Sequence, residues 1–238
     1  MAAQTSHTLS SHWVWLSHVL NADTPAYGGG ASIVVSLEKQ MAKGDSCNTS
    51  VIQMPCHVGS HVDAPRHFVA NGRTIDAYPP EEWIFSQPLV LEVSASTGSQ
   101  LLSSDDFEKR AIKVSNRSEI DFLFLRTGFS AKRKLKEYWE KGPGLSHDFS
   151  RQICCLFPGL KALGMDFISV SSLAYRDEGR RSHQYLLGKG VRLFEDLTLE
   201  DLAENLRLLK VVALPLRIEN SDGSPCTVMG QVDGKILR

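Results

Sequence analysis

The run His57-Val58-Gly59-Ser60-His61-Val62-Asp63-Ala64-Pro65-Arg66-His67-Phe68 places three imidazoles and one carboxylate within eleven residues. The whole chain has 8 histidines in 238 residues, so this run is a local concentration of them. Imidazole and carboxylate groups suit Zn, Mn or Fe, and three protein ligands beside an open position are typical of a catalytic metal site. The run therefore predicts a metal-dependent hydrolase; the alternative is a set of unrelated surface or core histidines.

The spacing of these ligands requires the chain to bend. A straight strand would place His57 and Asp63 roughly 20 Å apart, whereas donors to one metal lie within roughly 4 Å of one another. Gly59 is able to take the unusual φ of a sharp bend, and Pro65 disfavours helical backbone at the residue before it. A helix would also bring His57 and His61 together, but the intervening residues are poor helix formers. We therefore expect a bent strand-to-loop segment.

Composition predicts one folded domain over residues 1–238, with 42% hydrophobic and 22% charged residues. The net charge of −1 gives no basis for nucleic-acid binding. The basic run Lys132-Arg133-Lys134-Leu135-Lys136 is followed by Glu137 and Glu140 at helical spacings, which indicates a solvated helix face rather than a nucleic-acid patch.

The same composition predicts a cytoplasmic protein that does not enter the membrane. No apolar run approaches the ~20 residues that span a bilayer, and Met1 to Ser11 lacks the features of a secretory signal. The 5 cysteines are odd in number and lack a scaffold spacing, so we expect reduced, buried thiols.

Apolar runs bounded by polar or turn residues predict the strands, and capping and charge patterns predict the helices. Strands outnumber helices and alternate irregularly with them, which predicts an α/β fold with a mixed sheet. The expected strands are Trp13–Ser17, Ile33–Leu37, Thr49–Cys56, Leu89–Val93, Ile120–Arg126, Leu163–Ser169, Val191–Glu195, Val211–Ile218 and Cys226–Val232, and the expected helices are Ser104–Ala111, Ala131–Glu140 and Leu199–Leu208.

The histidine run matches the signature His-x-Gly-Thr-His-x-Asp-x-Pro-x-His-Phe, with Ser60 where threonine is usual. Four further segments, on both sides of the run, match the same family in order: Thr24-Pro25-Ala26-Tyr27-Gly28-Gly29, in which Gly28 replaces an expected proline, Leu163–Ser169, Leu214-Pro215-Leu216-Arg217 and Asp222-Gly223-Ser224-Pro225. Together they resemble the metal-dependent cyclase superfamily, which includes bacterial kynurenine formamidase, isatin hydrolase and a trans-dienelactone hydrolase.

The resemblance implies the metal and its ligands. Formamidase-like members hold two metals and use a later histidine and a glutamate twelve positions further on, the separation found here between His183 and Glu195. The cofactor would be Zn²⁺ or Mn²⁺, as one or two ions. The implied ligands are His57, His61, Asp63, His183 and Glu195.

Local sequence is consistent with both later ligands. Val191 and Leu193 indicate a short buried strand that ends at Glu195, and His183 opens a short helix that ends at Gly188. The alternatives are a glutamate that faces solvent and an exposed, purely polar histidine. At the family spacing, the ligand interpretation is favoured for the pair.

The resemblance also implies the remaining site residues. The matching histidine in the formamidases is the proton shuttle, which makes His67 the catalytic residue; the alternatives are a further ligand or a residue that orients a ligand. Tyr27 stands at the position of a family aromatic and would stack on an aryl ring. Arg66 departs from the small or apolar residue usual there and would meet a substrate carboxylate.

The resemblance implies a barrel-like core with flanking helices, of the swivelling β/β/α type, in a homodimer or homotetramer. The substrate that the resemblance favours most is a small molecule, an aryl formamide such as N-formylkynurenine in tryptophan catabolism. The alternatives are hydrolysis of isatin or of a dienelactone, and a noncatalytic protein that binds a metal or small ligand. His67 argues against the last, because binding alone would not require a proton shuttle.

Overall fold

The computed structural model describes residues 11–95, 99–102, 104–202 and 206–233. Within these residues the strands are β1 Ser11–Trp15, β2 Val34–Lys39, β3 Thr49–Gln53, β4 His61–Asp63, β5 Ile84–Phe85, β6 Pro88–Glu92, β7 Leu101–Leu102, β8 Phe122–Arg126, β9 Gly144–Leu145, β10 Ala162–Met165, β11 Arg192–Glu195, β12 Arg207–Pro215 and β13 Gly223–Asp233. The α-helices are α1 Ser104–Ala111, α2 Glu137–Glu140, α3 His147–Leu156 and α4 Arg176–Gly188.

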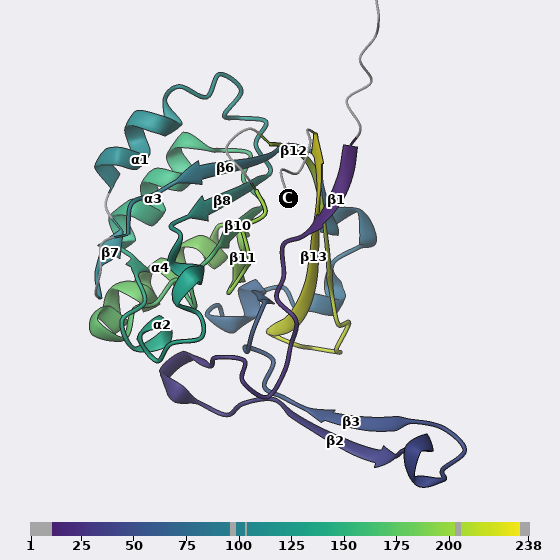
Figure 1. The fold of residues 1–238 in the computed structure, drawn as a ribbon. Coiled ribbons are helices and arrows are strands. Elements are labelled where there is room, and N and C mark those ends of the chain that lie inside the picture. The colour runs from purple at the N-terminus through teal and green to yellow at the C-terminus, as the bar shows by residue number, and fades with distance from the viewer. Residues whose placement is uncertain (1–10, 96–98, 103, 203–205, 234–238) are drawn as a thin grey trace, which may run out of the picture.

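The described strands form one large mixed sheet, whose order is β5-β12-β13-β4-β11-β10-β8-β6 with β1 paired to β13. Strands β6, β8, β10 and β11 are parallel to one another, whereas β4, β13, β12 and β5 join through antiparallel pairs. Because β12 returns to lie near β6, the sheet curls into a nearly closed barrel (Figure 1). The predicted α/β class with a barrel-like mixed sheet is confirmed.

Strand β8 shows why the barrel has two cores. Its residues are buried on both faces, as expected for a strand of a covered parallel sheet. Phe122 and Phe124 point into the barrel, and Leu123 and Leu125 point outward to a second core. Since side chains alternate along a strand, one apolar run supplies both cores.

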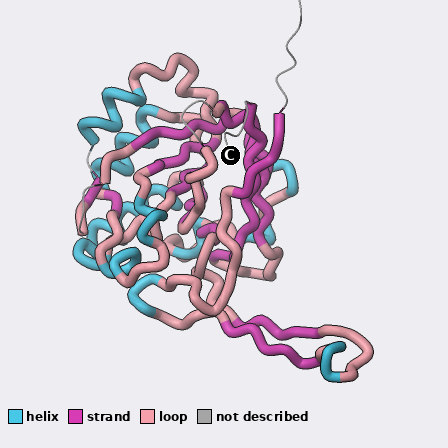
Figure 2. Tube along the Cα trace, viewed as in Figure 1, coloured by secondary structure: helices cyan, strands magenta, loops and turns pink. Residues whose placement is uncertain are grey.

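Helices α1, α3 and α4 cover the outer face of the parallel strands (Figures 1 and 2). Helix α3 begins after Ser146, whose hydroxyl accepts a hydrogen bond from the Phe149 amide at 3.1 Å. Strands β2 and β3 form a separate two-stranded hairpin that projects away from the barrel (Figure 1). The barrel and its helices therefore carry the core, and the hairpin stands outside it.

Most of the predicted elements are present with small shifts at their ends, and the helix Ser104–Ala111 has the predicted bounds. The predicted helix Ala131–Glu140 is confirmed only in part, as a 3-10 turn, Phe129–Lys132, and the short helix α2. Helix α3 was not predicted, although its serine cap is a visible signal.

The predicted helix Leu199–Leu208 is wrong. Residues 199–202 form a turn, residues 203–205 lie outside the described residues, and Arg207 begins strand β12. Leu208 pairs with Val232 of β13 and is buried in the barrel core. Pairing with β13 therefore overrides the local helical pattern.

The five cysteines are all free thiols, as predicted, but their burial differs from the prediction. Cys226 is buried, whereas Cys47 and Cys155 are exposed. Among the described residues, no helix combines the length and apolar character needed to cross a membrane.

Candidate metal centre

The polar cluster lies on the outer face of β4 and β11, at the point where these strands pair. Val62 and Phe194 point into the barrel core, so the alternation of side chains turns His61, Asp63 and Glu195 to the opposite face. In the antiparallel register Glu195 lies directly opposite His61. Two short strands therefore bring three predicted ligands together, and Glu195 ends its strand as predicted.

A bend at Gly59 brings His57 to the same place. Gly59 has φ +65°, and a Cβ there would lie 2.4 Å from Leu20 Cδ2, so both backbone conformation and space require glycine. Beyond it β4 is followed by a 3-10 turn at Pro65–His67. This geometry agrees with the predicted bent strand-to-loop segment. His57 Nδ1 lies 2.7 Å from Asp63 Oδ1.

Helix α4 contributes His183 from above the sheet. This helix begins at Arg176, so the prediction that His183 opens it is wrong, and His183 lies on a buried face within it. Its Nδ1 donates a hydrogen bond to the Gly179 carbonyl at 2.8 Å, one turn earlier. Nε2 then faces the cluster, 3.4 Å from Glu195 Oε1 and 3.7 Å from Asp63 Oδ2.

His61 is oriented in the same way. Its Nδ1 donates to the Gly59 carbonyl at 2.8 Å, and its Nε2 lies 3.3 Å from Asp63 Oδ1 and 3.5 Å from Glu195 Oε2. A backbone carbonyl thus accepts the Nδ1 proton of both buried histidines and turns Nε2 of each toward the carboxylates, where it can act as a ligand once its proton is lost. Glu195 is held by the Val170 amide, which donates to its Oε1 at 2.8 Å.

The cluster strongly favours positive charge. Burial by itself lowers the pKa of His61, but the hydrogen bond and charge of Asp63 and the charge of Glu195 outweigh it and raise this pKa to about 9. The pKa values of His57 and His183 are raised for the same balance of reasons. Burial opposes ionisation of Asp63, yet its hydrogen bonds to His57 and His61 hold its pKa well below the usual range.

These five side chains fit a divalent metal. They form two overlapping groups, His57–His61–Asp63 and Asp63–His183–Glu195, with Asp63 common to both. Nitrogen and oxygen donors of this kind suit Zn²⁺ and Mn²⁺. An ion bound there would compensate the charge of the two buried carboxylates, Asp63 and Glu195.

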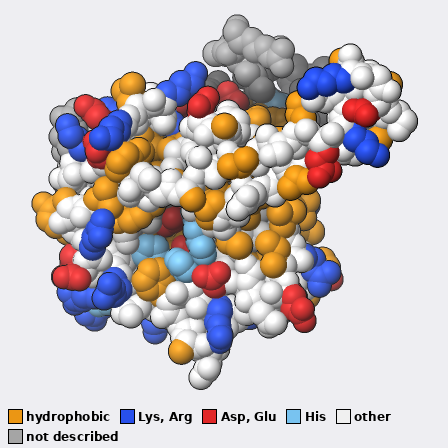
Figure 3. Space-filling model, turned by 90° about the horizontal axis from the view of Figure 1, so that it is seen from below, with side chains coloured by type: hydrophobic (Ala, Val, Ile, Leu, Met, Phe, Trp, Pro, Cys, Tyr) orange, Lys and Arg blue, Asp and Glu red, His pale blue; other side chains and the backbone are white. Residues whose placement is uncertain are grey.

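A cavity of about 160 Å³ opens beside the cluster. The histidines lie in a hollow on the lower face of the molecule, bordered by hydrophobic side chains and carboxylates (Figure 3). Tyr27 lines this cavity, as does Phe68, which stacks on the His183 ring at 4.5 Å. Burial raises the pKa of the half-buried Tyr27 hydroxyl. The other uncharged lining residues are Pro25, Val58, Gly59, Ile168, Ser169 and Ser171.

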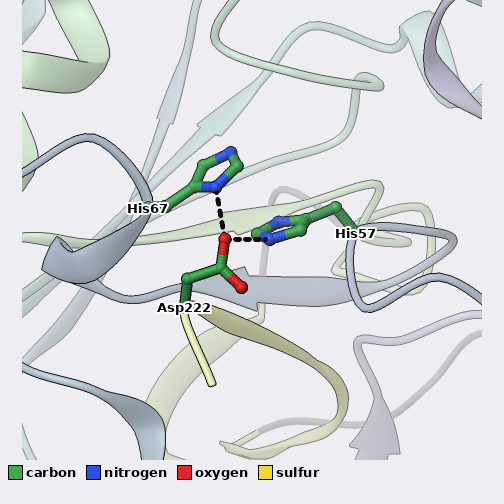
Figure 4. Close-up of side chains that lie close together, drawn as sticks. All are labelled: His57, His67 and Asp222. Carbon is green, nitrogen blue, oxygen red and sulfur yellow. Dashed lines mark hydrogen bonds and ion pairs between the residues drawn. The ribbon is translucent and has the colours of Figure 1, made fainter. Parts of the chain in front are cut away.

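His67 lies at the rim of the cavity beside Asp222, a residue for which the sequence predicted no role. Its Nδ1 is 2.8 Å from Asp222 Oδ2, and its ring stacks on that of His57 with centroids 3.9 Å apart. The same oxygen of Asp222 lies 3.1 Å from His57 Nε2 (Figure 4). Asp222 begins a segment that matches the family pattern, and this match is the signal by which the sequence could have indicated its role.

The structure does not bring Arg66 to the cavity. Its side chain is exposed and Nη1 donates a hydrogen bond to the Ala70 carbonyl within its own loop. It does not line the cavity that Tyr27 and His67 border. The predicted contact between Arg66 and a substrate carboxylate therefore has no support in the geometry.

The fold and the site define a barrel-like α/β protein with a histidine–carboxylate cluster, suited to a metal ion, on the outer face of its sheet. The Cyclase family model matches residues 14–172, and the chain belongs to this family. The predicted superfamily is therefore confirmed.

Relatives and structures of similar fold agree with this assignment. A kynurenine formamidase from Bacillus thuringiensis subsp. konkukian is 26% identical over 91% of this chain and 95% of its own length. Cyclase-like protein 1 from Oryza sativa subsp. japonica is 29% identical over 88% of this chain and 75% of its own length. Isatin hydrolase A from Labrenzia aggregata superposes with a TM-score of 0.76 at 22% identity, over 94% of both chains.

Proposed function

We propose that this protein is a metal-dependent hydrolase that cleaves the C–N bond of an aryl formamide, with N-formylkynurenine as its substrate. The observation that carries the proposal is the convergence of three histidines and two carboxylates beside a cavity that has His67 at its rim. The kynurenine formamidases among the relatives align over nearly the whole chain, which supports this substrate class.

The chemistry divides between the ion and the chain. A bound divalent ion polarises the substrate carbonyl and lowers the pKa of water. His67 takes a proton from the attacking water and gives it to the leaving nitrogen, the role in which histidine is the most frequent general acid–base residue. Water adds to the formyl carbon, the C–N bond breaks, and the products are formate and the aryl amine.

The cavity is consistent with one aromatic ring. Its volume of about 160 Å³ is close to the ~150 Å³ of an engineered cavity that holds benzene. Tyr27 supplies an aromatic wall, so Tyr27→Ala is expected to weaken binding of aryl substrates by ~1 kcal/mol through lost stacking. Small nonaromatic lactones should be almost unaffected, and equal effects on both substrate types would contradict the assigned stacking role.

The decisive experiment compares the metal-loaded protein on three substrate classes. The protein is loaded with Zn²⁺ or Mn²⁺, its metal content is measured, and its turnover is recorded on N-formylkynurenine, isatin and dienelactone. We expect the highest kcat/KM on the formamide. Preference for isatin or for the lactone would transfer the assignment to that activity. Metal binding without turnover on any of them would favour a noncatalytic role.

Metal binding is tested separately. Ligand histidines must be neutral to bind an ion, so affinity is expected to fall on acidification. Of the two ligand groups only the second includes Glu195, although its Oε2 also lies 3.5 Å from His61 Nε2. Glu195→Ala is therefore expected to remove one metal equivalent more readily than both. Elemental analysis that finds no transition metal after loading with Zn²⁺ and Mn²⁺ would overturn the proposal.

A further inference from the structure

Asp222 joins the two histidines that flank the rim of the cavity. Its Oδ2 lies 2.8 Å from His67 Nδ1 and 3.1 Å from His57 Nε2, and the two rings stack at a centroid distance of 3.9 Å (Figure 4). One carboxylate oxygen therefore contacts both a candidate metal ligand and the candidate proton shuttle.

The backbone holds Asp222 in place independently of its carboxylate. The Ala64 amide donates to the Asp222 carbonyl at 2.8 Å, and the Ile75 amide donates to the Ser221 carbonyl at 3.0 Å. The Asn220 amide donates to Asp76 Oδ1 at 3.1 Å. These bonds tie the loop before β13 to the segment that follows β4, so removal of the Asp222 carboxylate would leave the loop anchored.

An ionised carboxylate only accepts hydrogen bonds, and this fixes where the protons of both rings lie. His57 must carry a proton on Nε2 toward Asp222, and an ion that binds His57 would replace the proton that Nδ1 donates to Asp63. His67 must carry a proton on Nδ1, which leaves Nε2 as its free base. Carboxylates that accept from a metal-ligating histidine commonly fix its tautomer and ring orientation in this way.

We propose that Asp222 is a positioning residue that fixes the tautomers of His57 and His67, one for metal ligation and the other for proton transfer. This inference rests on the proposed function for the second of these roles. The Asp222 side chain is 43% exposed, so its packing contributes little, and its carboxylate contacts the two imidazoles. Loss of the carboxylate should therefore act through the rings.

The first test does not depend on activity. In the zinc-loaded protein with ¹⁵N-labelled histidine, long-range ¹H–¹⁵N spectra should show His67 protonated on Nδ1, and Asp222→Ala should shift it toward the Nε2–H form. Asp222→Asn, which keeps the shape of the side chain, provides a second variant. Asp76→Ala is the matched control, because it loosens the same loop without touching either ring. A His67 spectrum that is identical in wild type and Asp222→Ala would overturn the proposal.

The second test uses metal affinity and leaving groups. Asp222→Ala is expected to weaken zinc binding in a chelator competition by roughly 10- to 100-fold, the usual effect of losing a partner of a ligating histidine. At saturating zinc it should lower kcat on an aryl formamide with little change in KM. The loss should be much smaller on 4-nitrophenyl formate, because its leaving group departs without protonation.

A double variant separates positioning from general damage. In a His67→Ala background, Asp222→Ala should cause no further loss of turnover on the formamide. Additive losses, or equal losses on the formamide and the ester, would contradict the positioning role. If the wild-type protein hydrolyses neither compound, the proposed function fails, while the histidine spectra still decide whether Asp222 fixes the tautomers.

Discussion

Gly223 lies beside Asp63 in the sheet and directly against the ring of His57. A Cβ at this position would lie 2.2 Å from His57 Cε1 and 2.8 Å from both ring nitrogens. Real Cβ contacts are not this short, so a side chain at residue 223 would force the imidazole out of its place. The absence of a side chain at residue 223 therefore keeps His57 in place in the candidate metal centre.

Gly223→Ala should therefore displace His57 and impair the site. We expect turnover to fall roughly 10²-fold, as for other small misplacements of reacting groups, together with weaker zinc binding. Gly188→Ala is the control, because a Cβ there meets nothing within 4 Å. Kinetics and chelator competition on both variants check the prediction, and equal behaviour of the two would contradict it.

Substitution of His67 and of His61 should distinguish a role in the chemical step from a role in metal binding. His67→Ala is expected to keep most of the metal and lose roughly 10²- to 10⁴-fold in turnover, the usual contribution of a general acid–base group. His61→Ala should lose metal and activity together, because its Nε2 lies between Asp63 and Glu195. Elemental analysis and kcat decide the matter. A fully active His67→Ala protein would show that His67 is not the shuttle.

At the scale of elements, a buried ion pair connects α2 and its approach to the end of β11. Asp196 follows Glu195 directly, has φ +52° and is 1% exposed. Arg133 donates to both of its carboxylate oxygens, at 2.8 and 2.7 Å, and the Tyr138 hydroxyl donates to Oδ1 at 2.6 Å. Since the backbone turns sharply at Asp196, these bonds hold the strand end that carries Glu195.

Arg133→Leu should leave the Asp196 carboxylate buried without its charged partner. The free energy of unfolding is expected to fall by roughly 3–5 kcal/mol, the usual cost of breaking a buried pair. Lys136→Leu removes the exposed pair with Glu140 and should change stability by less than about 1 kcal/mol. Urea denaturation measures both. Similar losses would mean that the Arg133–Asp196 pair has no special structural role.

At the scale of the whole molecule, the β2–β3 hairpin exposes apolar side chains outside the core. Val35 pairs with Ile52, and Leu37 lies on the same face two residues on; they form an apolar strip. Leu37 is 63% and Ile52 58% exposed. A lone two-stranded hairpin is marginally stable in water, and exposed apolar surface of this kind is typical of protein contacts.

We expect this strip to mediate contact with a second copy of the chain, in line with the predicted homodimer or homotetramer. The double variant Leu37→Glu/Ile52→Glu should shift the protein toward monomer in sedimentation velocity. Ile112→Glu, at an equally exposed position after α1, is the control and should leave the distribution unchanged. A wild-type protein that sediments as a monomer would disprove the expectation.

The sequence by itself indicated the five residues that meet in the candidate metal centre, and it determined the local shape of the segment that carries most of them. Four of the five candidate ligands lie on short strands or on the bend next to them. The alternation of side chains along a strand and the positive φ that requires glycine at residue 59 are both local properties of the sequence. The separation of His183 and Glu195 is also visible in the sequence, although only the family resemblance indicated that the two are ligands. The burial of apolar runs such as Phe122–Leu125 could likewise be predicted from their local sequence.

Only the tertiary structure decided features that depend on residues far apart in the sequence. Asp222 lies 155 positions from His67 and 165 from His57, and it reaches them because β13 pairs with β4. Arg207 and Leu208 end the predicted helix but begin β12, since Leu208 gains more by pairing with β13 and filling the barrel than an isolated helix would supply. Local propensity amounts to tenths of a kcal/mol per residue, whereas burial of each side chain contributes ~1.5–3 kcal/mol, so the packing of the barrel prevails.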